Sequence, residues 1–242
     1  MIIDEGMWIA PLAGLLHDVG KFAQRAGWAR GKHAMASLQL LEDGGPLSHL
    51  VPLAWRDDVE DAVVYHHGGD THKPITQSVR VADWLAASER TRAAQERRFP
   101  AEAPLIPITA NLSLDEQAAT RPDQTTAQWG YPLGKAITGK VLFPEKNAVV
   151  SSGDYGALWD AFESGVREIP GPVDSFTRMS GLLDLLSETL TYMPSATPWE
   201  DHEERRTSPD VSLYNHLQLT AAISACLMRI HPDSLDQLHQ AG

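Results

Sequence analysis

Apolar residues recur at intervals of three and four near the start of the chain, and this spacing predicts an all-α fold. One stripe runs through Trp8, Leu12, Leu15, Leu16, Val19 and Phe22, the pattern of a single amphipathic helix. Further helices are expected at 33–41, at about 57–67, from Pro74 through a long charged extension, at 155–166, at 173–193 and at 211–230. Paired glycines after the second and third segments mark their ends.

Between Phe99 and Gly153 the helical pattern breaks into short apolar pieces separated by proline, glycine and polar residues. We expect loops there, with a short hairpin. The segment 194–210, with its three prolines and mixed charge, is typical of an exposed connection. The sequence therefore predicts one domain over residues 1–242, with a helical core at 1–98, an irregular insertion at 99–153 and completing helices at 154–242.

Composition limits the setting in which this domain works. The 242 residues are 43% hydrophobic, which is enough for a core, and the net charge of -12 means that nucleic acid could be bound only at a local basic patch. The single cysteine, Cys226, excludes an internal disulfide, and its apolar neighbours predict a small buried side chain in a reducing compartment. Without a targeting segment or an apolar run of about 18 residues, we expect a cytoplasmic protein that does not contact a membrane.

His17 and Asp18 lie side by side in "GLLHDVGKFAQRA", at the end of an apolar run that should be buried. Buried polar groups need partners. A divalent cation satisfies an imidazole and a carboxylate together, and ligand sets of nitrogen and oxygen suit manganese, iron, nickel or zinc. Such a pair can also be trivial, with one side chain facing solvent and the other capping a backbone group.

Other candidate ligands lie on the expected helices or at their ends, and they are His33, His66, His67, Asp83 and His216. Asp83 is on the apolar side of its helix, where an unpaired carboxylate would be unfavourable. The remaining histidines are in polar or loop contexts and are expected at the surface.

A basic run, "KFAQRAGWARGK", follows the His-Asp pair and carries Lys21, Arg25, Arg30 and Lys32 without one acidic residue. Such a run can be an ordinary solvated surface. With Trp28 inside it, the run also has the combination of cations and an aromatic ring that binds single-stranded nucleic acid. Since no base-reading motif is present, such binding would be largely independent of sequence.

The combination of "LLHDVGK", a later histidine, the "HH" doublet and "ADW" resembles the HD superfamily of metal-dependent phosphohydrolases. More narrowly, "LLHDVGKFAQRA", "VADWLAASER" and "DVSLYNHLQLTAAISACL" are similar to the N-terminal HD domain of the large subunit of type III CRISPR effector complexes, the Csm type especially. The resemblance covers most of the chain, including "YPL" and "LFP" in the irregular middle.

This resemblance implies a nuclease that cleaves single-stranded DNA with one or two divalent transition-metal ions. Manganese or nickel is expected first, with cobalt, iron, zinc or magnesium as alternatives. Its partners would be the other subunits and the guide RNA of such a complex, reached through the rest of the large subunit. Because the chain has no GGDD-type motif, no cyclase activity is assigned to it, and we expect it to be the HD portion of a longer protein.

The resemblance also implies roles for the candidate residues. Asp18 would bridge two ions, of which one would also take His17, Asp83 and His216 and the other would take His33 with His66 or His67. A single occupied site is also compatible with the pattern. Lys21 would neutralise charge on the phosphate, so the predicted catalytic residues are His17, Asp18 and Lys21.

The position of His216 depends on a circular permutation. Ordinary HD proteins carry one ligand histidine on a helix before the His-Asp pair, whereas only sixteen residues precede His17 here and none of them is histidine. The type III family resembles an HD bundle in which this helix has moved behind the rest, so the last helix should pack against the first. Two other functions stay open: an HD phosphohydrolase that acts on nucleotides or cyclic dinucleotides, and a docking module without activity.

Overall fold

The computed structural model describes residues 6–69, 71–87, 103–107, 129–134, 141–171, 173–195, 199–200, 207–208 and 211–229. These residues are mostly helical, which confirms the all-α class. The helices are α1 (Gly6–Leu16), α2 (Gly20–Arg25), α3 (His33–Leu41), the 3-10 helix η1 (Ser48–Leu50), α4 (Leu53–Tyr65), α5 (Pro74–Ala86), α6 (Ser152–Glu168), α7 (Ser175–Leu190) and α8 (Leu213–Leu227). Strands in this part of the chain are limited to two antiparallel pairs of two residues, β1 (Trp129–Gly130) with β2 (Glu145–Lys146) and β3 (Trp199–Glu200) with β4 (Thr207–Ser208).

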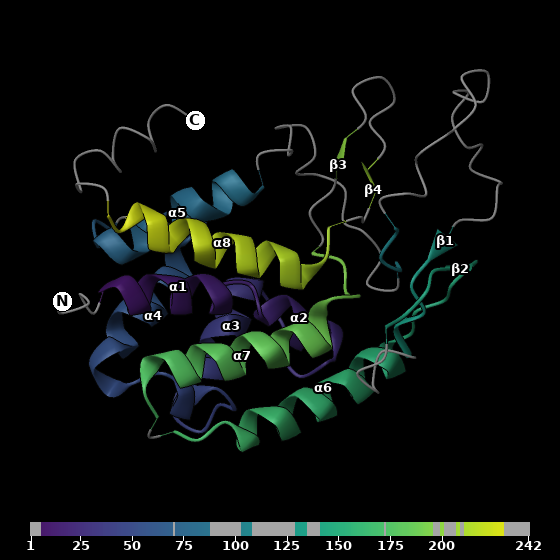
Figure 1. Cartoon of the computed structure of the whole chain (residues 1–242), viewed down its shortest axis with the longest axis horizontal. Helices are drawn as coiled ribbons and strands as arrows, with labels where there is room; N and C mark the ends of the chain where they lie inside the picture. Colours follow the sequence, from purple (N-terminus) through teal and green to yellow (C-terminus); the bar gives the residue numbers. More distant parts are fainter. Residues whose placement is uncertain are drawn as a thin grey trace.

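Helix α1 lies at the centre of the bundle and contacts α4, α5, α7 and α8 (Figure 1). Its sequence, GMWIAPLAGLL, carries no charge, and Leu12, Ala13 and Leu15 are completely buried. A helix that is apolar on all sides belongs inside a larger core. The helices on either side of the irregular middle therefore bury their apolar faces around a common element.

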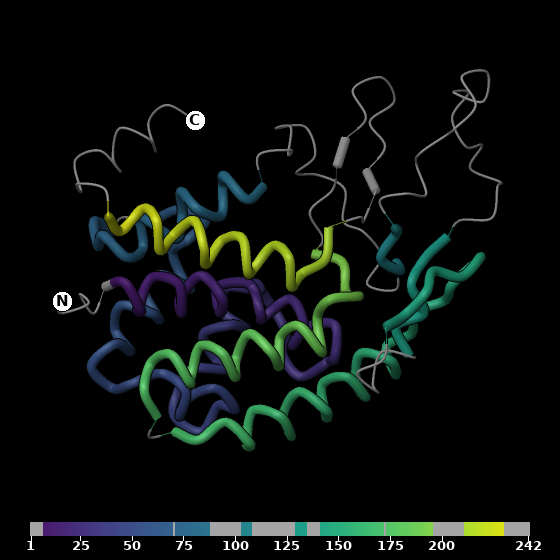
Figure 2. Tube along the Cα trace, viewed as in Figure 1, coloured from purple at the N-terminus to yellow at the C-terminus, as the bar shows by residue number. Residues whose placement is uncertain are grey.

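The first and last described helices lie side by side although they are far apart in sequence (Figure 2). Their backbones approach closely at Gly14, where an added Cβ would lie 2.8 Å from the Cα of Ala221 and 3.2 Å from the Oγ of Ser224. Only glycine fits between the two helices at this point. The packing of the last helix on the first is the arrangement that the permuted HD bundle implied.

The first predicted helix is interrupted, contrary to the single amphipathic stripe read from the sequence. Helix α1 ends at Leu16, His17 to Val19 form a turn, and α2 begins at Gly20. Ser37 of α3 supports the turn, because its Oγ accepts a hydrogen bond from the Gly20 N–H at 2.7 Å and donates one to the His17 carbonyl at 2.9 Å. The stripe is continuous across the break because both short helices bury their apolar residues in the same core.

Three other expectations differ in detail from the structure. Helix α4 begins at Leu53 after Pro52, earlier than the expected start near residue 57. Helix α5 ends at Ala86, and the predicted charged extension falls outside the described residues. Cys226 is exposed and not buried, because α8 turns a different face toward α1 and α5, through residues such as Leu217, Ala221 and Ser224.

Only parts of the segments predicted to be irregular are described. In the middle region, β1 and β2 form the short antiparallel pair, with Trp129 opposite Lys146. The predicted connection at 194–210 is described at its start and in the β3–β4 pair. None of the described helices is both long enough and apolar enough to cross a bilayer.

Candidate metal centre

His17 and Asp18 occupy the turn between α1 and α2, and both side chains are fully buried. The Nδ1 of His17 lies 2.8 Å from the carbonyl oxygen of Gly14. Because a carbonyl only accepts hydrogen bonds, Nδ1 carries the proton and Nε2 is left as the ligand atom. That Nε2 faces Asp18 Oδ2 at 3.5 Å and Asp83 Oδ1 at 3.6 Å.

His66, at the end of α4, is oriented by the same kind of hydrogen bond as His17. Its Nδ1 donates to the carbonyl oxygen of Val63 at 2.7 Å, again three residues earlier in the chain. Its Nε2 then faces Asp18 Oδ1 at 3.6 Å. The helical backbone therefore fixes both buried imidazoles with their free nitrogen toward the same centre.

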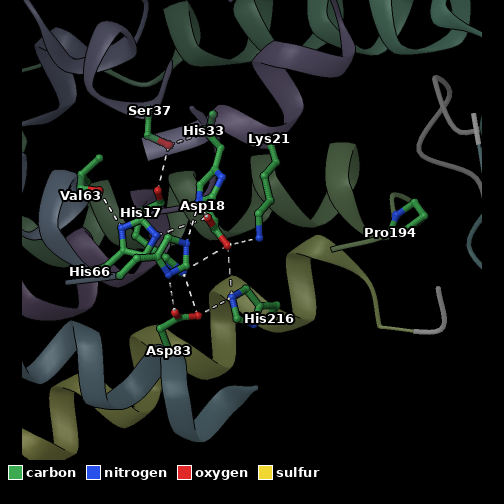
Figure 3. A network of polar contacts seen from close by, with 12 residues as sticks. His17, Asp18, Lys21, His33, Ser37, Val63, His66, Asp83, Pro194 and His216 are labelled. Atoms are coloured by element: carbon green, nitrogen blue, oxygen red, sulfur yellow. Dashed lines mark hydrogen bonds and ion pairs between the residues drawn. The ribbon is translucent and has the colours of Figure 1, made fainter. Parts of the chain in front are cut away.

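One group of possible ligands comprises His17, Asp18, Asp83 and His216, all of them buried (Figure 3). The Nε2 of His216 lies 3.1 Å from Asp83 Oδ1 and 3.4 Å from Asp18 Oδ2. One ligand atom from each of the four residues lies within 4.8 Å of all the others. These residues come from the α1–α2 turn, α5 and α8, so packing of those elements assembles the group.

A second group comprises Asp18, His33, His66 and His67, and it shares Asp18 with the first. The Oδ1 of Asp18 lies 3.2 Å from the Nε2 of His33, whereas its Oδ2 faces His216. His33 and His67 contact each other through their Nε2 atoms at 2.8 Å. The two oxygens of one carboxylate therefore face two different sets of ligands, with both His66 and His67 in the second set.

Hydrogen bonding inside the protein leaves this centre unsatisfied. Among the described residues, nine buried side-chain nitrogen or oxygen atoms make no contact with the geometry of a hydrogen bond, and five of them face one another in this cluster: His17 Nε2, Asp18 Oδ1, His66 Nε2, Asp83 Oδ1 and His216 Nε2. Buried polar atoms without partners destabilise a fold. Convergent imidazole nitrogens and carboxylate oxygens are the donor set of a divalent transition metal, so the residues present fit such an ion.

The carboxylates of the centre are held in their charged form. Burial by itself would raise the pKa of Asp18, but the nearby Lys21 and His17 outweigh it and hold the pKa well below the usual value. For Asp83, burial is likewise outweighed by His17 and His216, and the pKa is lowered. Both groups are therefore anionic at neutral pH, the form that binds a cation.

The imidazoles differ in their titration. Burial lowers the pKa of His33 to about 4 and the pKa of His67 to about 3. Burial alone would also lower the pKa of His216, but its contacts with Asp18 and Asp83 outweigh burial and raise that pKa. His33 and His67 are consequently neutral at pH 7 and able to donate a lone pair to a metal.

Lys21 and Ser37 contact the candidate ligands His17 and Asp18 from outside the two groups. The Nζ of Lys21 donates to Asp18 Oδ2 at 2.5 Å, and the lysine side chain is only 13% exposed. Ser37, through its contacts at Gly20 and His17, holds the ligand-bearing turn against α3. No role for Ser37 was predicted from the sequence. The one indication in the sequence is Gly20, because a Cβ at that position would collide with the backbone of His33 and Ser37.

The second ligand group borders a pocket. This pocket has a volume of about 730 Å³ and is lined by Gln24, Gly31, Lys32, His33, Ala34, Val64, His67 and Gly68. The side chains of His33 and His67 are 27% and 44% exposed, whereas no ligand of the first group exceeds 7%. The centre therefore opens to solvent on the side of His33 and His67.

The predicted basic patch is divided in the structure. Arg30 and Lys32 are exposed, and Trp28 is 39% exposed with its ring 5.5 Å from that of Trp159. Arg25 instead points inward, where its Nη1 donates to the Pro194 carbonyl at 2.6 Å. This arginine was predicted as a nucleic-acid contact, and because its guanidinium is engaged within the fold we no longer assign it to the patch.

Comparisons with known proteins agree with this architecture. The sequence model of the HD domain family matches residues 7–90. The single-strand-specific deoxyribonuclease Cas10/Csm1 of subtype III-A from Methanocaldococcus jannaschii is 27% identical over 232 aligned positions, and the match covers 91% of this chain and 28% of that protein. The protein of the same name from Enterococcus italicus is 26% identical over 231 aligned positions, and the match covers 88% of this chain and 27% of its own length.

Solved structures show the same fold. The crystal structure of Csm1 from Thermococcus onnurineus has a TM-score of 0.60 at 21% identity and covers 93% of this chain and 29% of its own. The Csm1–Csm4 subcomplex of the type III-A CRISPR-Csm interference complex has a TM-score of 0.57 at 19% identity, with coverage of 93% and 28%. The chain spans less than a third of the length of these relatives. Residues 7–90 match the HD domain family, and the chain as a whole is similar in sequence and fold to part of the Cas10/Csm1 proteins of subtype III-A.

Proposed function

We propose that this chain is a metal-dependent nuclease that hydrolyses single-stranded DNA as part of a type III-A CRISPR interference complex. The observation that carries the proposal is the position of Asp18, whose two oxygens face two groups of candidate ligands, the first buried and the second open to solvent at His33 and His67. The substrate is supported by the related Cas10/Csm1 proteins, which are named single-strand-specific deoxyribonucleases. The match covers only 28% of the first of these relatives. The activity named for that longer protein is therefore part of what we propose for this chain.

The ligands would divide between two ions. His17, Asp83 and His216 would hold one ion with Asp18 Oδ2, and His33, His66 and His67 would hold the other with Asp18 Oδ1. Divalent cations at such a site, when bound, polarise a phosphodiester and generate a hydroxide nucleophile near neutral pH. Manganese or nickel suits this mixed donor set first, with cobalt, iron, zinc and magnesium as alternatives.

The protein itself would position the substrate. The scissile phosphate would approach through the pocket beside His33 and His67, since the first ligand group is closed to solvent. Lys32 lines this pocket and Arg30 is exposed nearby in sequence, so both would contact the DNA backbone. The ammonium of Lys21, now paired with Asp18, would balance negative charge when the phosphate arrives.

Nuclease assays with defined substrates and metals test this function. Single-stranded and double-stranded DNA and RNA, a panel of nucleotides and cyclic dinucleotides are each incubated with manganese, nickel, cobalt or magnesium. We expect cleavage of single-stranded DNA in a transition metal. Selective hydrolysis of nucleotides would favour the phosphohydrolase alternative, and a chain that neither binds nor is stabilised by any of these metals would favour the docking module.

Substitution of the His-Asp pair gives the first prediction. Asp18→Ala and His17→Ala are expected to abolish metal-dependent cleavage and to keep the helical circular dichroism spectrum, because the apolar residues of α1 are unchanged. The matched control is Asp160→Ala, which removes an exposed carboxylate from α6. Wild-type cleavage by Asp18→Ala would refute the proposed centre.

The partners of this chain would be the other subunits and the guide RNA of a type III CRISPR complex. A solved Csm1–Csm4 subcomplex with the same fold supports contact with other subunits of a type III complex. We infer that the guide RNA is reached through those subunits. Co-purification of this HD domain, within its full large subunit, with guide RNA and the remaining subunits tests that assignment.

A further inference from the structure

Arg25 at the end of α2 is directed into the protein. Its Nη1 donates to the carbonyl oxygen of Pro194 at 2.6 Å, and its guanidinium carbon lies 5.8 Å from the ring centroid of the buried Tyr155. The ion pairs of the described residues do not include Arg25. A basic side chain that is engaged by a backbone carbonyl and an aromatic ring is placed to hold structure together.

The carbonyl of Pro194 belongs to the junction between α7 and α8. Pro194 forms an isolated antiparallel bridge with Ser212. On either side of this bridge, the N–H of Ser195 donates to the Val211 carbonyl at 2.8 Å and the N–H of Leu213 donates to the Met193 carbonyl at 2.7 Å. The chain that leaves α7 is thereby joined to the chain that enters α8, and Arg25 binds this joint from α2.

The joint lies one helical turn from a candidate ligand. Ser212 is the N-cap of α8, and its carbonyl accepts the hydrogen bond of the His216 N–H at 3.1 Å. Figure 3 shows His216 on the same side of the cluster as Pro194. A shift of Pro194 and Ser212 would therefore move the imidazole of His216 relative to Asp18 and Asp83.

We propose that Arg25 is a positioning residue that anchors the start of α8 to α2 and so holds His216 in the metal group. The inference rests on the proposed metal centre, and it explains why an arginine in a basic run turns away from solvent. The anchor joins α2, which begins two residues after Asp18, to the start of α8, which carries His216.

The test compares metal binding by Arg25→Met, Arg25→Lys and the matched control Arg30→Ala. Manganese affinity is measured by calorimetry, and the visible spectrum of added cobalt reports the ligand geometry, so neither readout depends on DNA cleavage. Loss of a group that hydrogen-bonds a metal ligand directly typically weakens metal binding by about 10-fold to 100-fold. Arg25 acts on His216 only through Pro194 and Ser212, so we expect Arg25→Met to weaken binding by about 10-fold, at the lower end of that range. Arg25→Lys keeps a donor and should recover part of the affinity, and Arg30→Ala should bind manganese like the wild type.

A double-mutant cycle with His216→Ala separates positioning from general destabilisation. If Arg25 acts through His216, Arg25→Met causes no further decrease of manganese affinity in the His216→Ala background. Unchanged metal affinity in Arg25→Met, together with weaker salt dependence of DNA binding, would overturn the proposal and return Arg25 to the DNA-binding patch. If Arg25→Met does not fold, Arg25→Gln replaces it, and wild-type affinity in that variant would overturn the proposal equally. A wild-type chain that binds no metal would refute the metal centre itself.

Discussion

His33 and His67 differ from the other candidate ligands because they contact each other as well as the carboxylates. Their Nε2 atoms are 2.8 Å apart, so one nitrogen must donate a hydrogen and the other must accept it. Two protonated imidazoles could not share this contact. The native fold therefore keeps at least one of the two rings neutral, in agreement with their lowered pKa values of about 4 and about 3.

This arrangement predicts that acid destabilises the metal-free protein. The unfolded chain takes up protons on these histidines near their ordinary pKa of 6.5, whereas folded His33 titrates at about 4. The free energy of unfolding should thus fall as the pH drops from 6.5 toward 4.5. His216 does not oppose this trend, because its raised pKa gives a contribution that is already complete below pH 6.5. Urea denaturation in a chelator at several pH values checks the slope.

The comparison variant for this experiment is the double substitution His33→Asn and His67→Asn, which removes both titrating rings. Its unfolding free energy should depend less on pH across the same window. The lowered pKa values of Asp18 and Asp83 stabilise the fold throughout this window, and that stabilisation is lost only at lower pH, as their carboxylates become protonated. A slope equal to that of the wild type would contradict the titration assigned to His33 and His67.

Helices α1 and α8 bring ligands from distant parts of the chain into one group. Gly14 lets the helices approach at Ala221, and the carbonyl of Gly14 accepts the hydrogen bond of His17 Nδ1. The residue at the closest point of the helix pair therefore also orients a ligand. Helix packing and ligand geometry are coupled at this position.

Gly14→Ala should accordingly impair both stability and metal binding. The added methyl group would overlap the Ala221 backbone, and overpacking of this kind typically costs about 1 to 3 kcal/mol. As α8 moves away, His216 leaves the group and manganese affinity falls. Thermal denaturation and calorimetry measure the two effects, with Gln218→Ala on the exposed face of α8 as a control that should change neither. Normal metal affinity in Gly14→Ala would show that the contact does not set the ligand geometry.

The molecule as a whole is acidic, and its exposed positive charge near the pocket is local. The net charge is -12, yet the run from Lys21 to Lys32 contains no acidic residue, and within it Arg30 and Lys32 face solvent. A strand of DNA would be repelled by most of the surface and attracted beside His33. The distribution of charge over the molecule thus favours approach of DNA to the candidate centre from the side of Arg30 and Lys32.

Arg30→Ala combined with Lys32→Ala should therefore weaken binding of single-stranded DNA and reduce its dependence on salt. For single strands, each phosphate that the protein no longer neutralises lowers the slope of log affinity against log salt by about 0.7. Manganese affinity should stay unchanged, since neither residue is a ligand. Fluorescence anisotropy across a salt series measures the slope, with Arg167→Ala at the exposed end of α6 as the control. A slope that matches the wild type would exclude these two residues from the DNA path.

The sequence predicts the helices and the clustering of the candidate ligands better than it predicts the contacts that support them. Periodic apolar residues and glycine stops give α3 its observed bounds, and the resemblance to HD domains names seven residues that the fold brings together. The break at His17 was missed because the apolar stripe continues across it. The contact of Arg25 with Pro194 was missed because a basic run in a sequence has the same pattern whether its side chains face solvent or reach a carbonyl 169 positions away.

The last described helix supplies one ligand to a group whose other members all lie before residue 84. During synthesis, a growing chain therefore possesses His17, Asp18 and Asp83 long before His216 leaves the ribosome. In the proposed centre, the first ligand group would be complete only after α8 docks beside α1. A metal ion held by all four residues would therefore report a finished bundle, and a chain cut before residue 211 would lack His216 and could not form the group.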